Sequence, residues 1–328
     1  MNTNKSKKTF KNKKRILTNT FFVAAVAIIC TLLWGTAFPA IKIGYRLFEI
    51  PGEDIPSKLI FAGARFFIAG ILVLLIGLCT KSRRKMLPGR RDILPVGLLG
   101  LFQTFFQYLL LYIGLVNVTG VRSSLLTSVS AFGSVILSAV FFKSDRLTPK
   151  KITGCVIGVL GLVVMCAGSE GLSGFTVMGD GLVILSNLSG SAGNIISKKS
   201  ASDRHPFMLS GWQLIFGGGE LLLLGAALGG RLNFQSAGCV LILIYLSLVA
   251  GVGFMLWTML LFYNDVSRVA VFNLLIPVFG TMWSGIFLSE KIFTLQNILS
   301  LILVCSGIFI VNSKFAKSTD PEKNTQKY

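Results

Sequence analysis

The sequence predicts an all-α membrane protein with about ten transmembrane helices, arranged as two inverted repeats of about five helices each. Three observations predict this fold class. Apolar runs long enough to cross a bilayer fill most of the 328 residues. Lys and Arg are abundant in one connecting loop and scarce in the next. The two halves of the chain also resemble each other at an offset of about 150 residues.

Each predicted helix is an apolar run of roughly the 20 residues that a helix needs to cross the hydrocarbon core. Hydrophobic residues make up 53% of the chain and charged residues 14%, which leaves little sequence for a soluble domain. In chain order the runs cover residues 21–44, 58–79, 93–115, 123–142, 152–168, 177–197, 207–228, 237–263, 269–288 and 295–312.

The basic residues of the first half indicate which side of the membrane each loop faces, because cytoplasmic loops collect Lys and Arg. The tail before run one carries about seven, whereas the loop after run one carries only Arg46 and Lys58. About six follow run two, and then Arg122 stands alone. The loop after run four is again basic, with Lys143, Arg146, Lys150 and Lys151.

The second half continues the alternation. No cation follows run five, and Lys198, Lys199 and Arg204 follow run six. Arg231, Arg268 and Lys291 are the single cations of the next three loops, and four Lys residues lie in the final tail. About 25 cations then face the cytoplasm and about five face outward, so both termini are predicted to be cytoplasmic. The protein is expected to lie in the cell membrane as a multi-pass protein.

Several other function classes are disfavoured. The excess of 32 Lys and Arg over 13 Asp and Glu would suit nucleic-acid binding in a soluble protein, but its placement follows membrane topology, so no nucleic-acid partner is expected. The first run is too long for a cleaved signal, and a retained helix is predicted. The six Cys lack CxxC spacing, and His205 is the single His, so neither a metal nor a cofactor is expected.

Internal similarity relates runs one to five to runs six to ten. Gly63-Ala64-Arg65 and Gly70 of run two match Gly211-Trp212-Gln213 and Gly218 of run seven. Leu33-Trp34-Gly35-Thr36-Ala37 of run one matches Leu188-Ser189-Gly190-Ser191-Ala192 of run six. The predicted division is a basic tail at 1–19, repeats at 20–169 and 170–313, and a second tail at 314–328.

A repeat with an odd number of spans enters the membrane in opposite senses in its two copies. Two such halves can pack in two ways of similar energy, one open to each side, which is the basis of alternating access. This arrangement predicts a carrier with a substrate site between the halves. The carrier's direct partners are then a small-molecule substrate and the lipid bilayer, and the sequence leaves a homodimer open.

The chain also resembles a known family. The residues concerned are Leu33-Trp34-Gly35-Thr36-Ala37-Phe38 with Lys42, then Arg65, then Pro277 followed by Gly285 and Leu288-Ser289-Glu290-Lys291. They are similar to motifs of the ten-helix EamA-type family of the drug/metabolite transporter superfamily, and the resemblance covers residues 20–312. Ser130 replaces a common Pro, and Asp145 replaces a common Glu. The resemblance implies a cytoplasmic-membrane carrier, often an exporter of amino acids or related compounds, with a central cavity.

Three intramembrane charges are candidates for function, because an ionisable group inside a bilayer costs at least ~2.5 kcal/mol unless it faces protein or water. Glu220 follows three glycines inside run seven, and we interpret it as a proton-coupling site. Its structural alternative is a partner of Arg65 or of polar groups on the helices. Lys42 and Arg65 are candidates for attracting an anion at an outer gate, and snorkelling to the interface is their structural alternative.

Polar and aromatic residues on shared helix faces predict the substrate pathway. Run three carries Gln103, Gln107 and Tyr108, and run six carries Asn187, Ser191 and Asn194. The remaining pathway candidates are Trp34, Thr36, Trp257 and Asn273. The alternative for each is helix packing, where interhelical hydrogen bonds contribute ~0.6 kcal/mol on average.

The functional prediction is a secondary transporter that moves a small metabolite, an amino acid or related compound, most simply outward. An enzyme is disfavoured because no paired carboxylates or Ser/His arrangement lies within the runs. A nucleotide-driven pump is disfavoured because the phosphate-loop motif is missing from the sequence. The alternatives are a channel-like facilitator and a translocator of lipid-linked substrates with the same bundle.

Overall fold

The computed structural model describes residues 15–79, 86–118, 123, 126–127, 129–166, 176–201, 204–288 and 295–313. The basic tails, most of the loop after run two, Arg122 and the Glu290-Lys291 motif lie outside these residues. Within the described part the chain is helical, without a β-strand. Its helices are α2 (Thr20–Leu47), α3 (Ile55–Leu78), α4 (Ile93–Gly100), η2 (Leu101–Phe106), α5 (Gln107–Gly114), α7 (Val129–Phe141), α8 (Pro149–Cys166), η4 (Val177–Gly181), α9 (Leu182–Lys199), α10 (Pro206–Ala227), α11 (Ala237–Tyr263), α12 (Val266–Ala270), η5 (Val271–Leu274), α13 (Leu275–Leu288) and α14 (Leu295–Asn312).

Local sequence explains where several helices begin. The side chain of Asn19 accepts hydrogen bonds from the first backbone N–H groups of α2, and that of Asp54 accepts one from Ser57 at the start of α3. Pro206 occupies the first turn of α10, where its missing N–H costs nothing. Where the structure describes them, the predicted runs lie mainly on helical backbone.

Five helical spans are long and apolar enough to cross a membrane by themselves. They are Thr20–Leu47, Ile55–Leu78, Ile93–Gly114, Pro206–Ala227 and Ala237–Tyr263. The other runs form shorter or less apolar helices. The multi-pass character is thus confirmed, and the count of ten crossings stays a prediction.

The helices are less regular than hydropathy implies. Run three contains a π-helical stretch, η2, between α4 and α5, and run six begins with the π-helical η4. Run nine changes from α to 3₁₀ geometry at η5. Such changes of hydrogen-bond spacing leave carbonyl groups free and are frequent at functional sites.

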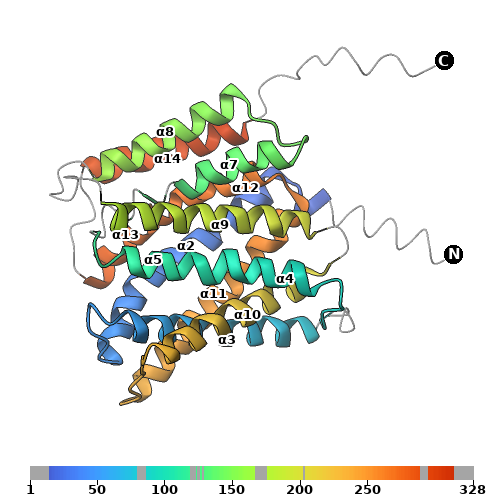
Figure 1. Ribbon diagram of the computed structural model, residues 1–328. Helices are drawn as coiled ribbons and strands as arrows, with labels where there is room; N and C mark the ends of the chain where they lie inside the picture. Colours follow the sequence, from blue (N-terminus) through green and yellow to red (C-terminus); the bar gives the residue numbers. More distant parts are fainter. Residues whose placement is uncertain are drawn as a thin grey trace, which may run out of the picture.

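Two helix pairs meet at glycines, with backbone against backbone. Gly63 and Gly70 of α3 lie against Gly218 and Gly211 of α10, respectively, and a Cβ on Gly63 would approach the Gly218 carbonyl oxygen to 2.7 Å. On the other flank of the bundle, Gly154 of α8 lies against Gly307 of α14 (Figure 1). Small residues let helices approach closely inside a bilayer, where packing drives association.

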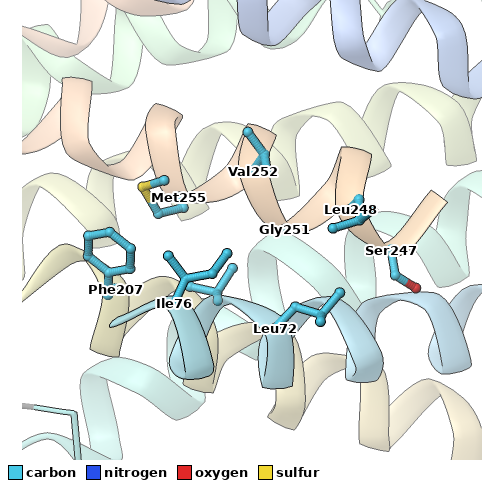
Figure 2. Close-up of a pocket in the computed structure, with 9 residues that line it drawn as sticks. Leu72, Ile76, Phe207, Ser247, Leu248, Gly251, Val252 and Met255 are labelled. Atoms are coloured by element: carbon cyan, nitrogen blue, oxygen red, sulfur yellow. The ribbon is translucent and has the colours of Figure 1, made fainter. Parts of the chain in front are cut away.

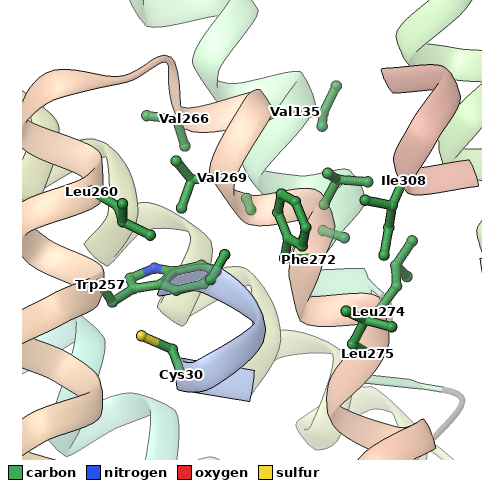
Figure 3. Packing of buried hydrophobic residues seen from close by; sticks show 14 of the residues in the cluster. Cys30, Val135, Trp257, Leu260, Val266, Val269, Phe272, Leu274, Leu275 and Ile308 are labelled. Carbon is green, nitrogen blue, oxygen red and sulfur yellow. The ribbon is translucent and has the colours of Figure 1, made fainter. Parts of the chain in front are cut away.

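The largest buried cluster lies around Trp257 of α11 and the α12–η5 segment. Figure 3 shows the indole of Trp257 beside Cys30, with Val269 and Phe272 of the neighbouring segment close by. A second cluster surrounds Phe66 of α3 and Phe254 of α11. Most buried residues of the bundle are therefore apolar, and burying a polar group among them costs free energy unless that group is hydrogen-bonded.

One end of the bundle, which we call the termini end, gathers both ends of the described chain (Figure 1). Asn264, which follows α11, donates to the Leu17 carbonyl and accepts from Lys198 through its own carbonyl. Lys150 donates to the Ser313 carbonyl, 2.6 Å away. These bonds place the two termini and the loops after α7, α9 and α11 on one side of the bundle.

The other end, which we call the opposite end, is joined by different contacts. Gln235 donates to Glu49, and the backbone N–H of Arg231 donates to the Ser57 hydroxyl. The loop after α2 therefore meets the loop after α10. Which end faces the cytoplasm stays a prediction from the distribution of Lys and Arg.

Candidate functional site

A buried polar network joins four helices around Asn194 of α9. The Asn194 side-chain oxygen accepts from Gln103 Nε2 at 3.2 Å and from Trp257 Nε1 at 3.1 Å. Its Nδ2 donates to the Ser134 hydroxyl of α7 at 3.1 Å. Asn194 and Gln103 are each only 4% exposed, and the Gln103 Oε1 has no hydrogen-bond partner among the described residues. The network therefore retains an unused acceptor inside the bundle.

The π-helical η2 positions this network. Its wider turn leaves carbonyl groups that α9 satisfies: Ser189 donates to the Phe102 carbonyl, and Ser186 donates to the Gln107 carbonyl, both at 2.6 Å. Glycines on α9 make room for the two glutamines, since a Cβ on Gly193 would meet Gln103 and one on Gly190 would meet Gln107. The glutamine face of run three thus lies directly against α9.

A second buried pair extends the polar region toward α10. The Thr104 hydroxyl donates to Gln213 Oε1 at 2.8 Å, while Gln213 Nε2 has no partner among the described residues. The sequence interpretation treated Gln213 only as part of the internal repeat. Its position beside the run-three stripe depends on the contact between α10 and η2, which periodicity within one helix does not encode.

Aromatic rings connect the network with the other half of the interior. Trp34 lies 5.1 Å from Trp257 and 5.5 Å from Phe254, measured between ring centres. Phe254 lies 6.2 Å from Phe66, and Phe66 lies 4.4 Å from Tyr108. These rings form a continuous apolar surface from α2 through α11 to α3 and α5.

Arg65 lies where this ring series ends. Its side chain is 4% exposed, and its Nη2 donates to the Tyr112 hydroxyl at 3.4 Å. The guanidinium carbon is 4.5 Å from the centre of the Phe66 ring and 5.5 Å from that of Tyr108. Arg65 is therefore buried among aromatic groups and is not exposed on the surface of the bundle.

The other pathway candidates lie at varied distances from the network. Ser191 donates to the Ser130 carbonyl of α7, and Asn187 donates to the Val183 carbonyl in its own helix. Asn273 lies in η5 and has a buried Oδ1 without a partner among the described residues. Thr36 lies apart, where it accepts from the Tyr245 hydroxyl.

The charge candidates differ in burial. Lys42 is exposed on α2, whereas Glu220 is half-buried on α10 with one carboxylate oxygen, Oε2, buried and without a hydrogen bond from the described residues. Among the described residues no ion pair joins Glu220 to Arg65, because the ion pairs there are Lys151–Asp145 and Arg204–Asp92.

A small apolar pocket lies elsewhere, between α3, α10 and α11. Figure 2 shows Ile76, Phe207 and Met255 around it. Its polar side chain, Ser247, donates to the Leu243 carbonyl of its own helix. None of the predicted pathway residues lines this pocket.

At the termini end a buried carboxylate joins the two halves of the chain. Asp145, after α7, accepts from the Ser267 backbone N–H at 2.9 Å, from the Ser267 hydroxyl, and from Lys151 Nζ at 2.5 Å. Burial by itself raises the pKa of Asp145, but the hydrogen bonds from Lys151 and Ser267 outweigh it and hold this pKa below its ordinary value.

The described residues contain no group of three or more His, Cys, Asp or Glu that could hold a metal ion. His205 lies before α10 and stacks on Phe207. Among the described residues, the interior offers hydrogen-bonding groups, aromatic rings and the enclosed guanidinium of Arg65.

Comparisons with known proteins agree with this architecture. The EamA-like transporter family model matches residues 21–167 and again residues 177–313. An uncharacterized transporter of Archaeoglobus fulgidus is 29% identical over 88% of this chain and 98% of its own length. A probable amino-acid metabolite efflux pump of Escherichia coli is 28% identical over 87% of this chain and 93% of its own.

A shorter similarity joins residues of this chain to a probable terminal-alkyne amino-acid exporter of Streptantibioticus cattleyicolor, which is 29% identical over 43% of this chain and 44% of its own. A solved crystal structure has the same fold, with a TM-score of 0.72 at 18% identity over 88% of this chain and 95% of that chain. Since the family model matches both halves of the sequence, the chain belongs to the EamA-like transporter family and is a multi-pass membrane transporter, not an enzyme.

Proposed function

We propose that this transporter exports an amino acid or a related small metabolite across the cytoplasmic membrane by alternating access. The observation that carries the proposal is the Asn194 network, because it combines side chains from both halves of the chain. Gln103 and Ser134 come from the first half, and Asn194 and Trp257 from the second. Amides and an indole N–H suit a small polar or zwitterionic molecule.

Two relatives support the same substrate class, since one is a probable amino-acid metabolite efflux pump and the other a probable terminal-alkyne amino-acid exporter. Trp257 lies about 9 Å from the end of its helix at the termini end, at 1.5 Å per residue. The network is thus inside the bundle, beneath the termini end.

The glycine contacts between α3 and α10 support two inverted repeats, 20–169 and 170–313. Sequence similarity relates Gly63 to Gly211 and Gly70 to Gly218. In the structure Gly63 meets Gly218 and Gly70 meets Gly211. Such reciprocal contact is what a two-fold axis between equivalent helices produces. A pseudo-axis in the membrane plane would allow the two halves to exchange inward-open and outward-open packing.

The test is counterflow in proteoliposomes. Vesicles preloaded with one unlabelled amino acid at a time are given the same labelled amino acid outside, for a panel of aromatic, branched-chain and polar amino acids. Saturable exchange is the expected result. A flux that rises linearly with concentration would indicate a channel-like facilitator, and no exchange by folded protein would favour lipid-linked substrates.

Asn194→Ala tests the network itself. We expect the half-saturating concentration to rise several-fold, because Asn194 holds three other polar side chains in place. Asn312→Ala is the matched control, since Asn312 donates only to the Ile308 carbonyl of its own helix. Equal kinetics for the two variants would remove the network from the proposed binding site.

The proposed orientation puts the termini end in the cytoplasm. Cys79 is exposed and ends α3 at the termini end. In a variant that keeps only this cysteine, a membrane-impermeant maleimide should label permeabilised cells and leave intact cells unlabelled. Labelling of intact cells would reverse the orientation.

A further inference from the structure

Arg65 is a buried cation without a carboxylate partner among the described residues. The two ion pairs there, Lys151–Asp145 and Arg204–Asp92, both lie at the termini end. Among the described residues, Arg65 donates one long hydrogen bond, to Tyr112, and its buried Nε has no partner there. A charge that is withdrawn from water and left uncompensated destabilises the fold that contains it. The structure therefore retains an unfavourable group that packing alone does not explain.

The internal repeat supplies a direct comparison. Arg65 corresponds to Gln213 in the second half, and the flanking glycines of these two residues meet across the α3–α10 contact. Gln213 is fully buried and neutral at the equivalent place. The position can thus be filled without a charge, and the positive charge of Arg65 is specific to one half.

The surroundings of Arg65 suit an anion with an apolar body. A planar guanidinium binds a carboxylate through two parallel hydrogen bonds. Tyr112 and Tyr45 add hydroxyl groups, which lie close enough to interact with the guanidinium and with each other. Phe66 and Tyr108 present ring faces within 6 Å of the guanidinium carbon.

From Phe66 the ring surface continues through Phe254 to Trp34 and Trp257, and Trp257 donates to Asn194. A molecule whose carboxylate lies at Arg65 would have its apolar portion against these rings. We propose that Arg65 binds the carboxylate of the transported molecule, and that this molecule is an amino acid or related carboxylic acid with an apolar side chain. This inference rests on the proposed function and adds the group by which the substrate is recognised.

The test compares a carboxylate with its neutral counterpart. Phenylalanine and leucine are compared with their amides, which keep the amino group and side chain, as competitors of counterflow. In the wild type we expect the acid to compete at least 10-fold better than the amide. Arg65→Gln, which copies Gln213, should remove this preference, and Arg65→Lys should retain part of it. Arg46→Gln is the control, because Arg46 is exposed at the end of α2.

Thermal unfolding in detergent separates recognition from folding. Without ligand, Arg65→Gln should unfold at the same temperature as the wild type or higher, since it removes an uncompensated charge. Phenylalanine or leucine should raise the unfolding temperature of the wild type more than its amide does, and Arg65→Gln should abolish the difference. A lower unfolding temperature without ligand, or equal effects of acid and amide on the wild type, would overturn the assignment.

The two proposals fail in distinguishable ways. If counterflow is absent but the wild type is stabilised by the acid and not the amide, transport of these amino acids is rejected and the carboxylate site stands. If counterflow is saturable but acid and amide compete equally, transport stands and the role of Arg65 is rejected. If neither counterflow nor acid-selective stabilisation is found, both are rejected.

Discussion

Replacing Asp145 by Asn should destabilise the protein by about 3 kcal/mol. Asp145 is 2% exposed and accepts three hydrogen bonds, two from Ser267 and one from Lys151. The Asn amide keeps one acceptor oxygen and places an NH₂ group where the second carboxylate oxygen accepted hydrogen bonds. At least one charge-assisted hydrogen bond is therefore lost, and such a bond contributes about 1.5–3 kcal/mol to stability. The partly exposed Lys151 pair adds about 0.5–1 kcal/mol.

The loss of stability is measured by thermal unfolding in detergent. A dye reports unfolding by reacting with buried thiols, such as those of Cys30 and Cys155, as they become exposed. We expect the midpoint to fall by about 5–10 °C. Asp92→Asn is the control, because the Arg204–Asp92 pair is a partly exposed loop contact and should contribute less than about 1 kcal/mol. Equal midpoints for the two variants would refute the reasoning.

The Asp145→Asn variant also tests how the stability of the protein depends on pH. Because the pKa of Asp145 is lower in the folded protein than in the unfolded chain, its ionised form favours folding. This contribution is present above the unfolded pKa of about 4 and is lost as the pH falls through the lower folded value. The difference in stability between wild type and Asp145→Asn should therefore be constant from neutral pH to about pH 5 and shrink below about pH 4. A difference that grows on acidification would contradict this account.

Three further predictions concern the interior. Gln107→Ala should raise the half-saturating substrate concentration roughly 2- to 10-fold, because the substrate would lose one contact with an amide. Unchanged affinity with normal folding would exclude Gln107 from the pathway. Glu220→Gln should make counterflow insensitive to an imposed pH gradient while exchange continues, whereas retained sensitivity would assign Glu220 a structural role. Gly63→Ala should lower stability by about 1–3 kcal/mol in thermal unfolding, because its Cβ would lie 2.6 Å from the Leu222 backbone nitrogen. A Cβ added to Gly97 would have no neighbouring atom within 4 Å, so Gly97→Ala should be neutral or stabilising. Similar losses of stability in the two variants would contradict this reasoning.

The sequence predicts the helical layout well, because bilayer thickness fixes the length of an apolar run. The runs at 237–263 and 295–312 coincide with the bounds of α11 and α14. The π and 3₁₀ stretches at η2 and η5 were not predicted. Hydropathy reports the environment of a side chain, whereas the spacing of backbone hydrogen bonds depends on neighbours such as Ser186 and Ser189.

The sequence pattern named three members of the polar network, Gln103, Asn194 and Trp257, and their role as a substrate site stays a prediction. A stripe on one helix places Gln103 on an inward face, but which residue of another helix meets that face depends on rotation and depth, and so the contacts of Ser134 and Gln213 were not predicted. Charge alone did not separate Lys42, which is exposed, from Arg65, which is enclosed by aromatic rings. That distinction depends on tertiary packing.

The glycine contacts described above limit how this transporter can change shape. Where Gly63 meets Gly218 and Gly154 meets Gly307, no side chain separates the two backbones, so neither helix can turn or slide without collision. Each contact joins a helix of one half of the sequence to a helix of the other. The pairs α3–α10 and α8–α14 are therefore close contacts between the halves on the two flanks of the bundle. In the proposed alternating-access cycle, movement between the halves would therefore occur where side chains and hydrogen bonds can rearrange, as between η2 and α9. The hydrogen bonds of the polar network would then be among those that rearrange during the proposed cycle.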